Sequence, residues 1–466
     1  MAPREACAVF SAYSRSADAD VSGLIFGGLL ALQHRGQESA GMTVLKNNRL
    51  LTFKGLGLVL QVFDRNVLNE LRSPRGIGHV RYSTYGASAL RNAQPIELNS
   101  KPRFALCFNG TIVNYDELRT ELKGKGYRFE TTSDSEVIGY LISDGLKHNS
   151  TLIEAIRYAM DKLEGAYSAT LLSEDGSMAV FRDPYGFRPL CMGYMKDLDA
   201  YVFSSETAGL DAVNASFIED VQPGSIKLVE DGKVRSVKVS ESRHAHCMFE
   251  WVYFARQDSA IEGIDVFEVR WRLGEKLAEL NPVDVDYVVP VPETSRVAAL
   301  GYSARSGIPI MEGFGVNRYA LRTFIMPANR GYFARLKLNP LKRVLKGKRI
   351  VLIDDSIVRG TTSRTIVSML KKAGVKEVHL KITCPPLIAP CYMGVDFPTF
   401  EELIAHGRSV EDIRRAIGAD SLTYMTVEGL VEAIGLPRDE LCLACLTGVY
   451  PEGIRPRFKS REVIKR

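Results

Sequence analysis

The chain has 466 residues, of which 45% are hydrophobic and 25% are charged, and its formal net charge at pH 7 is +5. A chain of this length holds about two to four domains. Its ordinary composition argues against a disordered, collagen-like or coiled-coil protein. The charge excess is small, and no basic block resembles a nucleic-acid-binding arm, so nucleic acid is not an expected partner. The locally basic tail Arg455–Arg466 is expected to be a solvated terminus.

Several features indicate a cytoplasmic protein that does not bind or cross a membrane. The longest apolar run, Val21–Leu32, is shorter than the roughly 18–20 residues of a membrane span and contains three glycines, so it predicts a buried helix. No basic segment followed by an apolar one begins at Met1, as a secretory signal would. The eight cysteines in such a chain point to metal binding or catalysis rather than to a disulfide framework.

The first half of the chain predicts sheets covered by helices, an α+β architecture. Short apolar runs separated by Gly, Asn, Asp and Ser are typical of strands. We expect strands at Gly76–Val80, Arg103–Phe108, Tyr167–Leu172, Met178–Phe181 and Tyr201–Phe203, and helices at Asp116–Leu122, Ser135–Leu146 and Leu152–Leu163. The stretch from Val239 to His246 is polar and unpatterned, which favours a domain boundary there.

The second half alternates strand and helix, which predicts an α/β domain with a parallel sheet. Strands are expected at Asp286–Val291, Ile308–Met311, Lys348–Ile353 and Glu377–Thr383, and helices at Val266–Leu280, Thr294–Arg305 and Thr361–Ala373. After Phe397 the pattern is mostly that of short helices.

Cys7 is a candidate nucleophile because only six residues precede it. A lone cysteine at such a place is more often a small buried hydrophobe. If residues 1–6 were removed as a propeptide, Cys7 would carry the free α-amine of the chain. That amine has a pKa of about 7.7–8.0 and can act as the base for the adjacent thiol.

Four further segments are consistent with such a nucleophile, although each has an ordinary structural explanation as a turn, a cap or an ion pair. They are the polar cluster Gln33–Glu38, Arg81 within Gly78–Thr84, the Asn109-Gly110 pair that can form an oxyanion hole, and Asp134 within Thr132–Glu136. In this order they resemble the class II glutamine amidotransferase domain, an N-terminal-nucleophile hydrolase. Arg182–Leu190 and Ser204–Glu206 match that domain as well.

The segment Arg349–Ser363 is the strongest local signal. An apolar strand ends in Asp354 and Asp355, and a loop rich in Gly, Ser and Thr opens a helix whose N–H groups can bind an anion. Gly360 allows the backbone to approach a phosphate closely. It is not a Walker A loop. The plain alternative is a capped helix beside a solvated acidic pair. The pattern resembles type I phosphoribosyltransferases, which bind 5-phosphoribosyl-1-pyrophosphate (PRPP) here.

Two other segments fit a PRPP site. The loop Val288–Arg296 is suited to pyrophosphate, or is a plain proline-rich turn. The long stretch Asn317–Pro340 is either a lid over an anionic substrate or a solvated loop. Its basic residues are Arg318, Arg322, Arg330, Arg335 and Lys337.

A class II glutaminase followed by a type I phosphoribosyltransferase resembles the amidophosphoribosyltransferase family over nearly the whole chain. The resemblance implies a propeptide at 1–6, a glutaminase domain at 7–245, a phosphoribosyltransferase domain at 246–440 and a C-terminal segment at 441–466. It also implies that ammonia released from glutamine passes through an internal channel and displaces pyrophosphate from PRPP. The product, 5-phosphoribosylamine, opens purine nucleotide synthesis.

The resemblance also implies roles for individual residues. Cys7 attacks the glutamine amide, Asn109 and Gly110 stabilise the oxyanion, Arg81 holds the α-carboxylate and Asp134 the α-amine. Magnesium is held by Asp354, Asp355 and Thr294, and close relatives carry Ser at the last position. PRPP is bound by Asp354, Asp355, Ser356, Arg359, Gly360, Thr361, Thr362, Ser363 and Lys337. Ala6 and Ala8 depart from the family pattern, which usually has an acid before the cleavage point and Gly after the nucleophile.

The remaining cysteines are candidate metal ligands. Cys442 and Cys445 form a C-x-x-C pair that zinc, a redox pair or an iron–sulfur cluster would suit, and Cys247, Cys391 and Cys384 are possible further ligands. One branch of the family carries a 4Fe–4S cluster, whose ligands match Cys247, Cys391, Cys442 and Cys445. The alternative is four unligated thiols, as in the cluster-free branch.

The family further implies a homotetramer that purine nucleotides inhibit. Two other functions deserve comparison. A glutaminase that feeds another acceptor would not need the Asp354–Ser363 loop. A non-catalytic, regulatory PRPP-binding paralogue would not need the full set of reacting residues.

Overall fold

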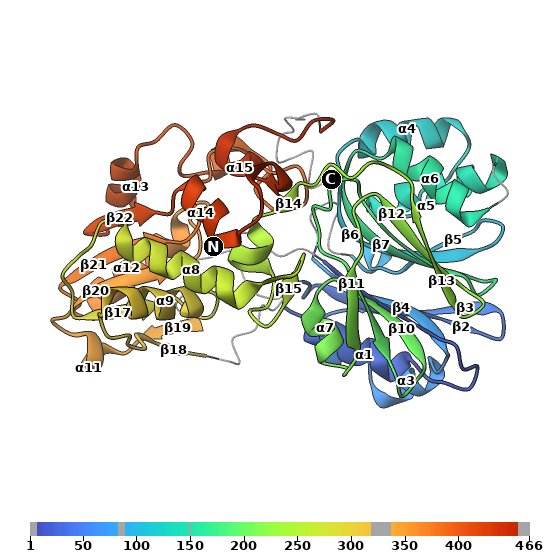
Figure 1. Ribbon diagram of the computed structural model, residues 1–466, viewed down its shortest axis with the longest axis horizontal. Helices are drawn as coiled ribbons and strands as arrows, with labels where there is room; N and C mark the ends of the chain where they lie inside the picture. Colours follow the sequence, from blue (N-terminus) through green and yellow to red (C-terminus); the bar gives the residue numbers. More distant parts are fainter. Residues whose placement is uncertain (1–6, 83–88, 149–150, 318–336, 455–466) are drawn as a thin grey trace.

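The computed structural model describes residues 7–82, 89–148, 151–317 and 337–454, and the chain forms two lobes that lie side by side. The first half of the chain builds one lobe and most of the second half builds the other (Figure 1). In the described part of the chain, no helix is long and apolar enough to cross a membrane.

The first lobe contains two antiparallel sheets. In spatial order, the seven-stranded sheet consists of β11 (Ser216–Asp220), β9 (Cys191–Met195), β10 (Ala200–Ser204), β1 (Ala8–Ser14), β4 (Arg75–Arg81), β2 (Ser39–Lys46) and β3 (Arg49–Leu56). The six-stranded sheet consists of β13 (Lys233–Lys238), β12 (Ser225–Glu230), β8 (Met178–Arg182), β7 (Gly165–Ser173), β6 (Phe104–Ile112) and β5 (Ile96–Leu98).

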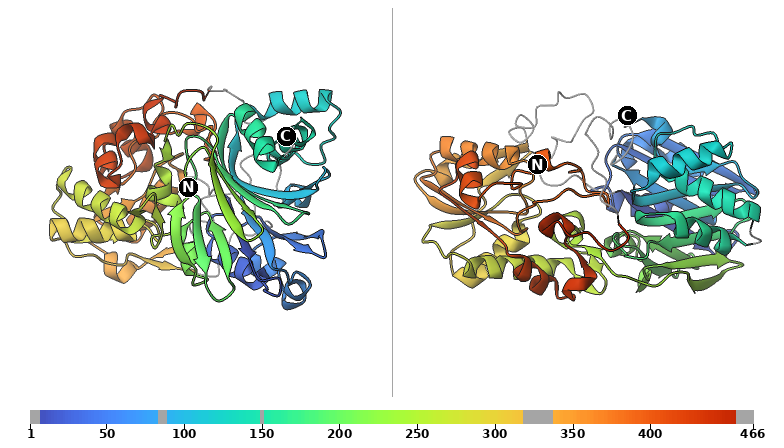
Figure 2. Two further views of the ribbon diagram at one scale, coloured as in Figure 1. Left: turned by 45° about the vertical axis from the view of Figure 1, so that its right-hand side comes forward. Right: turned by 90° about the horizontal axis from the view of Figure 1, so that it is seen from above.

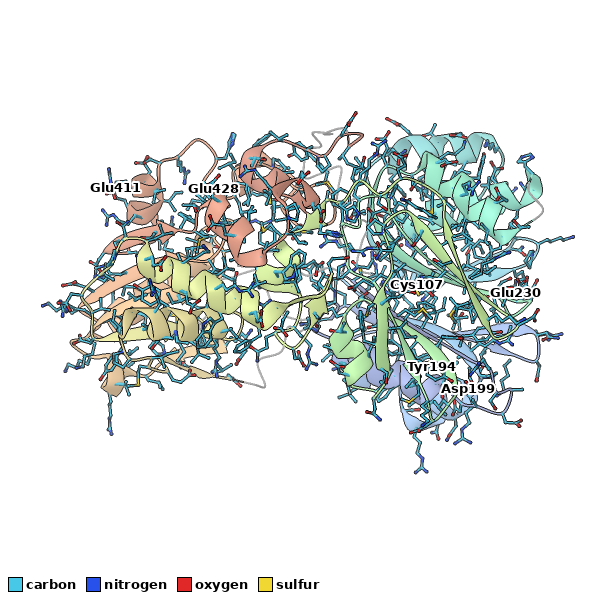
Figure 3. The ribbon with its side chains drawn as sticks, in the orientation of Figure 1. Cys107, Tyr194, Asp199, Glu230, Glu411 and Glu428 are labelled. Carbon is cyan, nitrogen blue, oxygen red and sulfur yellow. The ribbon has the colours of Figure 1, made fainter. Side chains whose placement is uncertain are left out.

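The two sheets pack face to face. Val9 and Ile77 of the first sheet share one apolar core with Cys107, Leu172 and Val180 of the second. Figure 3 shows Cys107 inside this lobe. Alternate residues of each strand point the other way, so each sheet has a second apolar face that must also be covered.

Helices cover these outer faces and complete a four-layered α+β sandwich. Over the first sheet lie α1 (Ser22–Ala31), α2 (Val59–Val62), α3 (Arg65–Glu70) and α7 (Thr207–Asp211). Over the second lie α4 (Tyr115–Gly124), α5 (Ser135–His148) and α6 (Leu152–Lys162), and a short 3-10 turn spans Leu90–Asn92. Helix α1 packs closely on β1, because a Cβ at Gly28 would lie 2.3 Å from the ring of Phe10.

The second lobe is built on a four-stranded parallel sheet. The strands, in spatial order, are β17 (Tyr287–Pro290), β20 (Arg349–Asp354), β21 (Glu377–Ile382) and β22 (Ser421–Tyr424). The helices are α8 (Val266–Glu279), α9 (Arg296–Ser306), α11 (Lys342–Leu345), α12 (Thr361–Lys372), α13 (Val410–Ile417), α14 (Val427–Ile434) and the short turns η3 (Phe400–Glu402) and η4 (Arg438–Glu440). One apolar core joins this sheet to its helices, as expected for an α/β domain.

Short elements connect the lobes and flank the sheet. A π-helix, η2 (Glu250–Phe254), follows β14 (His246–Cys247), which pairs in parallel with β23 (Leu441–Cys442) before α15 (Ala444–Thr447). The hairpins are β15 (Ala260–Ile261) with β16 (Ile264–Asp265), and β18 (Phe314–Val316) with β19 (Leu338–Pro340). Figure 1 labels β14 and α15 on the side of the second lobe that faces the first, and the view from above in Figure 2 shows the two lobes side by side.

The expected architecture is confirmed, with two differences. The strand expected at Ile308–Met311 is wrong, since only an isolated parallel bridge joins Ile310 to Val288. Pro309 has no N–H, which prevents a continuous ladder. Strand β22 lies where only short helices were expected, because its polar Ser and Thr residues gave no apolar run.

Candidate active sites

Cys7 lies immediately before β1, at the centre of the seven-stranded sheet, and its side chain is buried. Its thiol donates a hydrogen bond to the carbonyl oxygen of Tyr82 at 3.3 Å, and the Tyr82 N–H lies 3.4 Å from the sulfur. Burial raises the pKa of the Cys7 thiol, and the nearby Arg81 charge opposes that rise. The thiol is therefore protonated at neutral pH, and a base must remove its proton before it can attack.

Two charged residues of opposite sign flank this thiol. Arg81 is the last residue of β4, Asp134 immediately precedes α5, and the charges of both act on Cys7. Burial raises the pKa of Asp134 to about 6, against the lowering effect of the Ile112 N–H, which donates to its carboxylate at 3.1 Å, and of Arg81. A cation and an acid on either side of a thiol are suited to hold an amino acid by its carboxylate and ammonium groups.

Asn109 and Gly110 lie on β6 between Cys107, which interacts with Cys7, and Ile112, whose N–H donates to Asp134. The side chain of Asn109 is fully buried, and neither its Nδ2 nor its Oδ1 has a hydrogen-bond partner among the described residues. A buried amide without a partner costs free energy and calls for an explanation. Gly110 has φ +151°, and a Cβ there would lie 1.8 Å from the carbonyl oxygen of Ala166, so only glycine fits. The arrangement is suited to receive a polar ligand atom at Asn109.

The second group of residues lies at the carboxyl end of β20, a central strand of the parallel sheet, which is where such sheets bind ligands. Asp354 and Asp355 are both nearly buried. Burial raises the pKa of both carboxyls, and the proximity of Asp355 raises that of Asp354 further. Ser356 donates to Asp355 at 2.7 Å, and the Thr294 side chain lies close enough to Asp355 to lower the pKa of its carboxyl, against the larger raising effect of burial. The fold thus brings Thr294 to the diacid.

The loop after this pair ends in the expected helix α12. Gly360 has φ +72° and its absent Cβ would lie 2.4 Å from Ile404, so the turn requires glycine. Within the described residues no side chain caps the N-terminus of α12, which leaves that end suited to an anion. Arg359 donates to Glu402 at 2.8 Å, and its Nε and Nη1 have no partner in the described part of the chain.

The other predicted phosphate ligands lie along the same turn. Ser363 is buried, Thr362 is half-buried and Thr361 is exposed. Lys337 is exposed immediately before β19, and its carbonyl oxygen accepts from the Asn317 N–H at 2.9 Å. The basic residues expected in the lid, Arg318, Arg322, Arg330 and Arg335, lie outside the described residues, as does the propeptide 1–6.

Four cysteines gather beside this second lobe. Cys247 of β14 lies opposite Cys442 of β23, and electrostatic interactions connect Cys445 to Cys247, Cys391 and Cys442. Burial raises the pKa of all four thiols, that of Cys247 to about 12. None of the eight cysteines, all of which the structure describes, forms a disulfide. Cys384 also interacts with Cys445 and Cys247, so a fifth thiol lies close to the four.

The number and type of donor side chains indicate which metal each of the two groups could hold. Within the described ranges, no group of three or more His, Cys, Asp or Glu side chains is placed to hold a metal ion. In a 4Fe–4S cluster each thiolate binds a different iron, and four thiols from three segments match that donor set in number and type. At the diacid, magnesium usually takes one or two carboxylates and completes its shell with water and substrate phosphate, which two aspartates and a threonine allow.

Sequence reasoning missed a set of buried charges that lies between the two sites. Arg35 and Glu206 were noticed only as parts of matching motifs, and no role was predicted for Glu250 or Arg188. Arg35 donates from Nε to the carbonyl oxygen of Cys7 at 3.1 Å and from its terminal nitrogens to Glu250 at 2.9 Å. The polar cluster Gln33–Glu38 follows an apolar helix, which indicated a buried polar contact. The residue that Arg35 contacts could not be identified from the sequence.

The fold and the two sites define an enzyme class: a class II glutaminase joined to a type I phosphoribosyltransferase. A glutamine amidotransferase domain model matches residues 79–212. The chain is 48% identical to an amidophosphoribosyltransferase of Methanocaldococcus jannaschii, over 96% of this chain and 97% of that protein. It is 42% identical to the amidophosphoribosyltransferase of Bacillus subtilis, over 97% of this chain and 95% of that one.

A solved structure agrees. Glutamine PRPP amidotransferase from B. subtilis, complexed with ADP and GMP, has a TM-score of 0.90 and 41% identity, covering 98% of this chain and 100% of that one. The chain belongs to the amidophosphoribosyltransferase family, whose glutamine-dependent reaction on PRPP serves purine biosynthesis.

Proposed function

We propose that this chain hydrolyses glutamine at Cys7 and transfers the ammonia to PRPP at the diacid of β20. The products are glutamate, pyrophosphate and 5-phosphoribosylamine, the first committed intermediate of purine nucleotide synthesis. The observation that carries the proposal is the pair of sites on one chain: a buried thiol beside an unpartnered Asn109 amide, and a carboxylate pair before an uncapped helix.

The first half-reaction uses the residues around Cys7. After removal of residues 1–6, the α-amine of Cys7 takes the thiol proton, and the sulfur attacks the amide carbon of glutamine. Asn109 Nδ2 and the Gly110 N–H donate to the oxyanion. Its collapse breaks the C–N bond, and the leaving nitrogen takes the proton and departs as ammonia. Water then attacks the thioester and releases glutamate. Arg81 and Asp134 hold the substrate by its carboxylate and ammonium groups.

The second half-reaction uses the residues around Asp354. Ser356 and the turn from Arg359 to Ser363 hold the 5-phosphate of PRPP, and the diacid holds the ribose hydroxyls. Ammonia attacks C1 of the ribose, and the bond to pyrophosphate breaks with both electrons. Magnesium bound by Asp354, Asp355 and Thr294 would neutralise charge on the leaving pyrophosphate. Lys337 and the segment before it would close over the substrate, and ammonia would reach it through an internal channel.

We further propose that Cys247, Cys391, Cys442 and Cys445 hold a 4Fe–4S cluster. Four thiols from three segments, with Cys442 and Cys445 buried and Cys247 and Cys391 half-buried, support this assignment. Such a cluster would stabilise the fold and contribute nothing to the transfer step. The C-terminal segment 441–466 would thereby be fixed to the start of the second domain, since β14 and β23 are neighbours.

Other features of the family are proposals for this chain. We divide it into a propeptide at 1–6, a glutaminase domain at 7–245, a phosphoribosyltransferase domain at 246–440 and a C-terminal segment. We also propose a homotetramer inhibited by purine nucleotides, and a cytoplasmic location. Nucleotide inhibition is supported by the B. subtilis structure with ADP and GMP, and a reducing compartment is supported by eight unpaired thiols.

The test is an anaerobic assay of pyrophosphate release from PRPP and magnesium, with glutamine or with ammonium as nitrogen donor. Release with both donors is expected. Release with ammonium alone would show that the second site works and that Cys7 has not matured. Release with neither donor would refute the proposed enzyme and favour a regulatory PRPP-binding protein.

A further inference from the structure

A fully buried network of charges begins at the nucleophile. Arg35 donates to the Cys7 carbonyl oxygen, forms an ion pair with Glu206, and makes two hydrogen bonds of 2.9 Å to Glu250. Glu250 also accepts a hydrogen bond of 3.0 Å from Arg188. The side chains of all four charged residues are at most 1% exposed. Glu250 is therefore held by two arginines of the first lobe.

The network continues toward the PRPP site through η2, whose first residue is Glu250. Arg270 of α8 donates to the carbonyl oxygens of Trp251 at 2.9 Å and of Ala255 at 2.7 Å. The same arginine is buried and its charge interacts with Asp355. The short π-helix η2 thus contacts two arginines. Its first residue, Glu250, binds Arg35, which also contacts Cys7. Its backbone accepts a hydrogen bond from Arg270, whose charge interacts with the diacid. Such helices are rare and are often found at functional sites.

Stability alone is a weak explanation of these pairs. A buried ion pair is often no more stabilising than apolar residues of the same volume, while removal of one partner leaves a costly unpaired charge. In addition, the hydrogen bond from Arg35 to the Cys7 carbonyl constrains where Cys7 lies. It fixes the residue whose sulfur must meet the substrate carbon, and small misplacements of a nucleophile lower the rate strongly.

Building on the function proposed above, we propose that the Arg35–Glu250 pair is the positioning element that couples the glutaminase site to the PRPP site. Occupation of the diacid changes the charge that Arg270 faces, and Arg270 holds the carbonyl of Trp251 in η2 and that of Ala255 immediately after it. A shift of η2 moves the Glu250 carboxylate, and Arg35 transmits the shift to Cys7. Arg35 contacts Cys7 through its carbonyl oxygen and Glu250 contacts Arg35, so both act through the position of Cys7.

The test measures glutamate release with and without PRPP, and ammonium-dependent pyrophosphate release, for the full-length protein and the isosteric variant Glu250→Gln. The ratio of glutamate release with PRPP to that without it should fall roughly fivefold or more in the variant. Ammonium-dependent release should stay within about twofold of the wild-type rate, because Glu250 lies outside the PRPP site. Arg35→Lys should lower kcat for glutamine and leave its KM nearly unchanged.

Arg182→Lys is the matched control. Arg182 is also fully buried and donates to the carbonyl oxygens of Val221, Gly186 and Arg188. Its side chain therefore meets the network at the backbone of Arg188, and within the described residues it bonds to neither Cys7 nor Glu250. In Arg182→Lys, the ratio of glutamate release with PRPP to that without it should equal the wild-type ratio. In the double variant of Arg35→Lys with Glu250→Gln, this ratio should be no lower than in the poorer of the two single variants. If Glu250→Gln keeps the wild-type ratio, or the control loses it equally, the coupling role is refuted. Wild-type protein inactive with both donors would instead overturn the proposed function and the coupling with it.

Discussion

The carboxylate of Glu250 accepts two hydrogen bonds of 2.9 Å from the guanidinium of Arg35, although 215 positions separate the two residues in sequence. Arg35 follows the first helix of the glutaminase lobe, and Glu250 begins the π-helix that leads into the second lobe. Because Arg35 also holds the Cys7 carbonyl, Arg35 connects Cys7 to a residue beyond the two sheets of its own lobe. Six predictions test the chemistry on either side of this contact.

Cys7→Ala is expected to abolish glutamine-dependent pyrophosphate release and to leave ammonium-dependent release intact, because only the first half-reaction needs the thiol. The measurement is pyrophosphate release with each donor. Cys191→Ala is the control, since Cys191 is likewise buried but hydrogen-bonds to Ser204 on the neighbouring strand. Loss of both activities in Cys7→Ala alone would contradict two separate sites.

Asn109→Ala should lower kcat for glutamine by roughly 10²–10³, the usual effect of losing one oxyanion donor. Its KM should change little, because the amide would bind the oxyanion more strongly than the ground-state carbonyl. The free energy of unfolding should not fall, since the amide has no partner in the described structure. A variant that is destabilised but fully active would assign Asn109 a structural role.

The KM for glutamine should rise as the pH falls below about 6. Burial raises the pKa of Asp134 to about 6, so this carboxyl, which would hold the substrate ammonium, becomes neutral in that range. Arg81, Cys7 and Tyr115 face the same carboxyl. Steady-state glutaminase kinetics from pH 5 to 8 give the profile. In Asp134→Asn, the KM for glutamine should be high at every pH and should not change near pH 6. If the change near pH 6 persists in this variant, another group causes it.

The same pKa shift has a consequence for stability. A carboxyl whose pKa is raised in the folded state binds more protons there than in the unfolded chain, so its contribution to stability is lost as the pH rises through about 6. Asp134→Asn should therefore be more stable to urea than the wild type at pH 7, and the difference should shrink at pH 5. An advantage of equal size at both pH values would argue against this titration.

Asp354→Asn combined with Asp355→Asn should abolish pyrophosphate release with either donor, because both carboxylates lie where PRPP and magnesium would bind. PRPP binding measured by calorimetry should be lost as well. The variant should fold, since removing two buried carboxylates that repel each other relieves a cost. Asp286→Asn is a control that keeps magnesium-dependent binding, because Asp286 accepts the Arg349 N–H at 2.7 Å at the opposite end of the parallel sheet. Activity in the double variant would place the PRPP site elsewhere.

Protein purified without oxygen should be brown and contain both iron and sulfide if the four cysteines hold the proposed cluster. Cys442→Ser should lower both contents, and Cys191→Ser should leave them unchanged, because Cys191 lies in the glutaminase sheet. Removal of iron with a chelator should lower the melting temperature. A colourless protein that contains zinc would refute the cluster.

Much of the fold could be predicted because its elements carry strong local patterns. Helices α4, α5 and α6 agree with the expected segments within two residues at each end, and β20 with α12 follows the predicted phosphate loop. Strand β22 was missed, because Ser421 and Thr423 make its pattern polar although the strand is paired to β21. The predicted strand after Ser306 was wrong because an isolated bridge replaces it.

The candidate residues follow from the sequence alone, since a thiol, an Asn-Gly pair, two aspartates and four cysteines are defined by local order. Family resemblance then assigned each a role. Only the tertiary structure decided which distant residues meet: Thr294 at Asp355, Cys247 opposite Cys442, and Arg35 between Cys7 and Glu250. Ion pairs of this kind leave no periodic signal, because each depends on strand order and on packing between lobes rather than on neighbours in the chain.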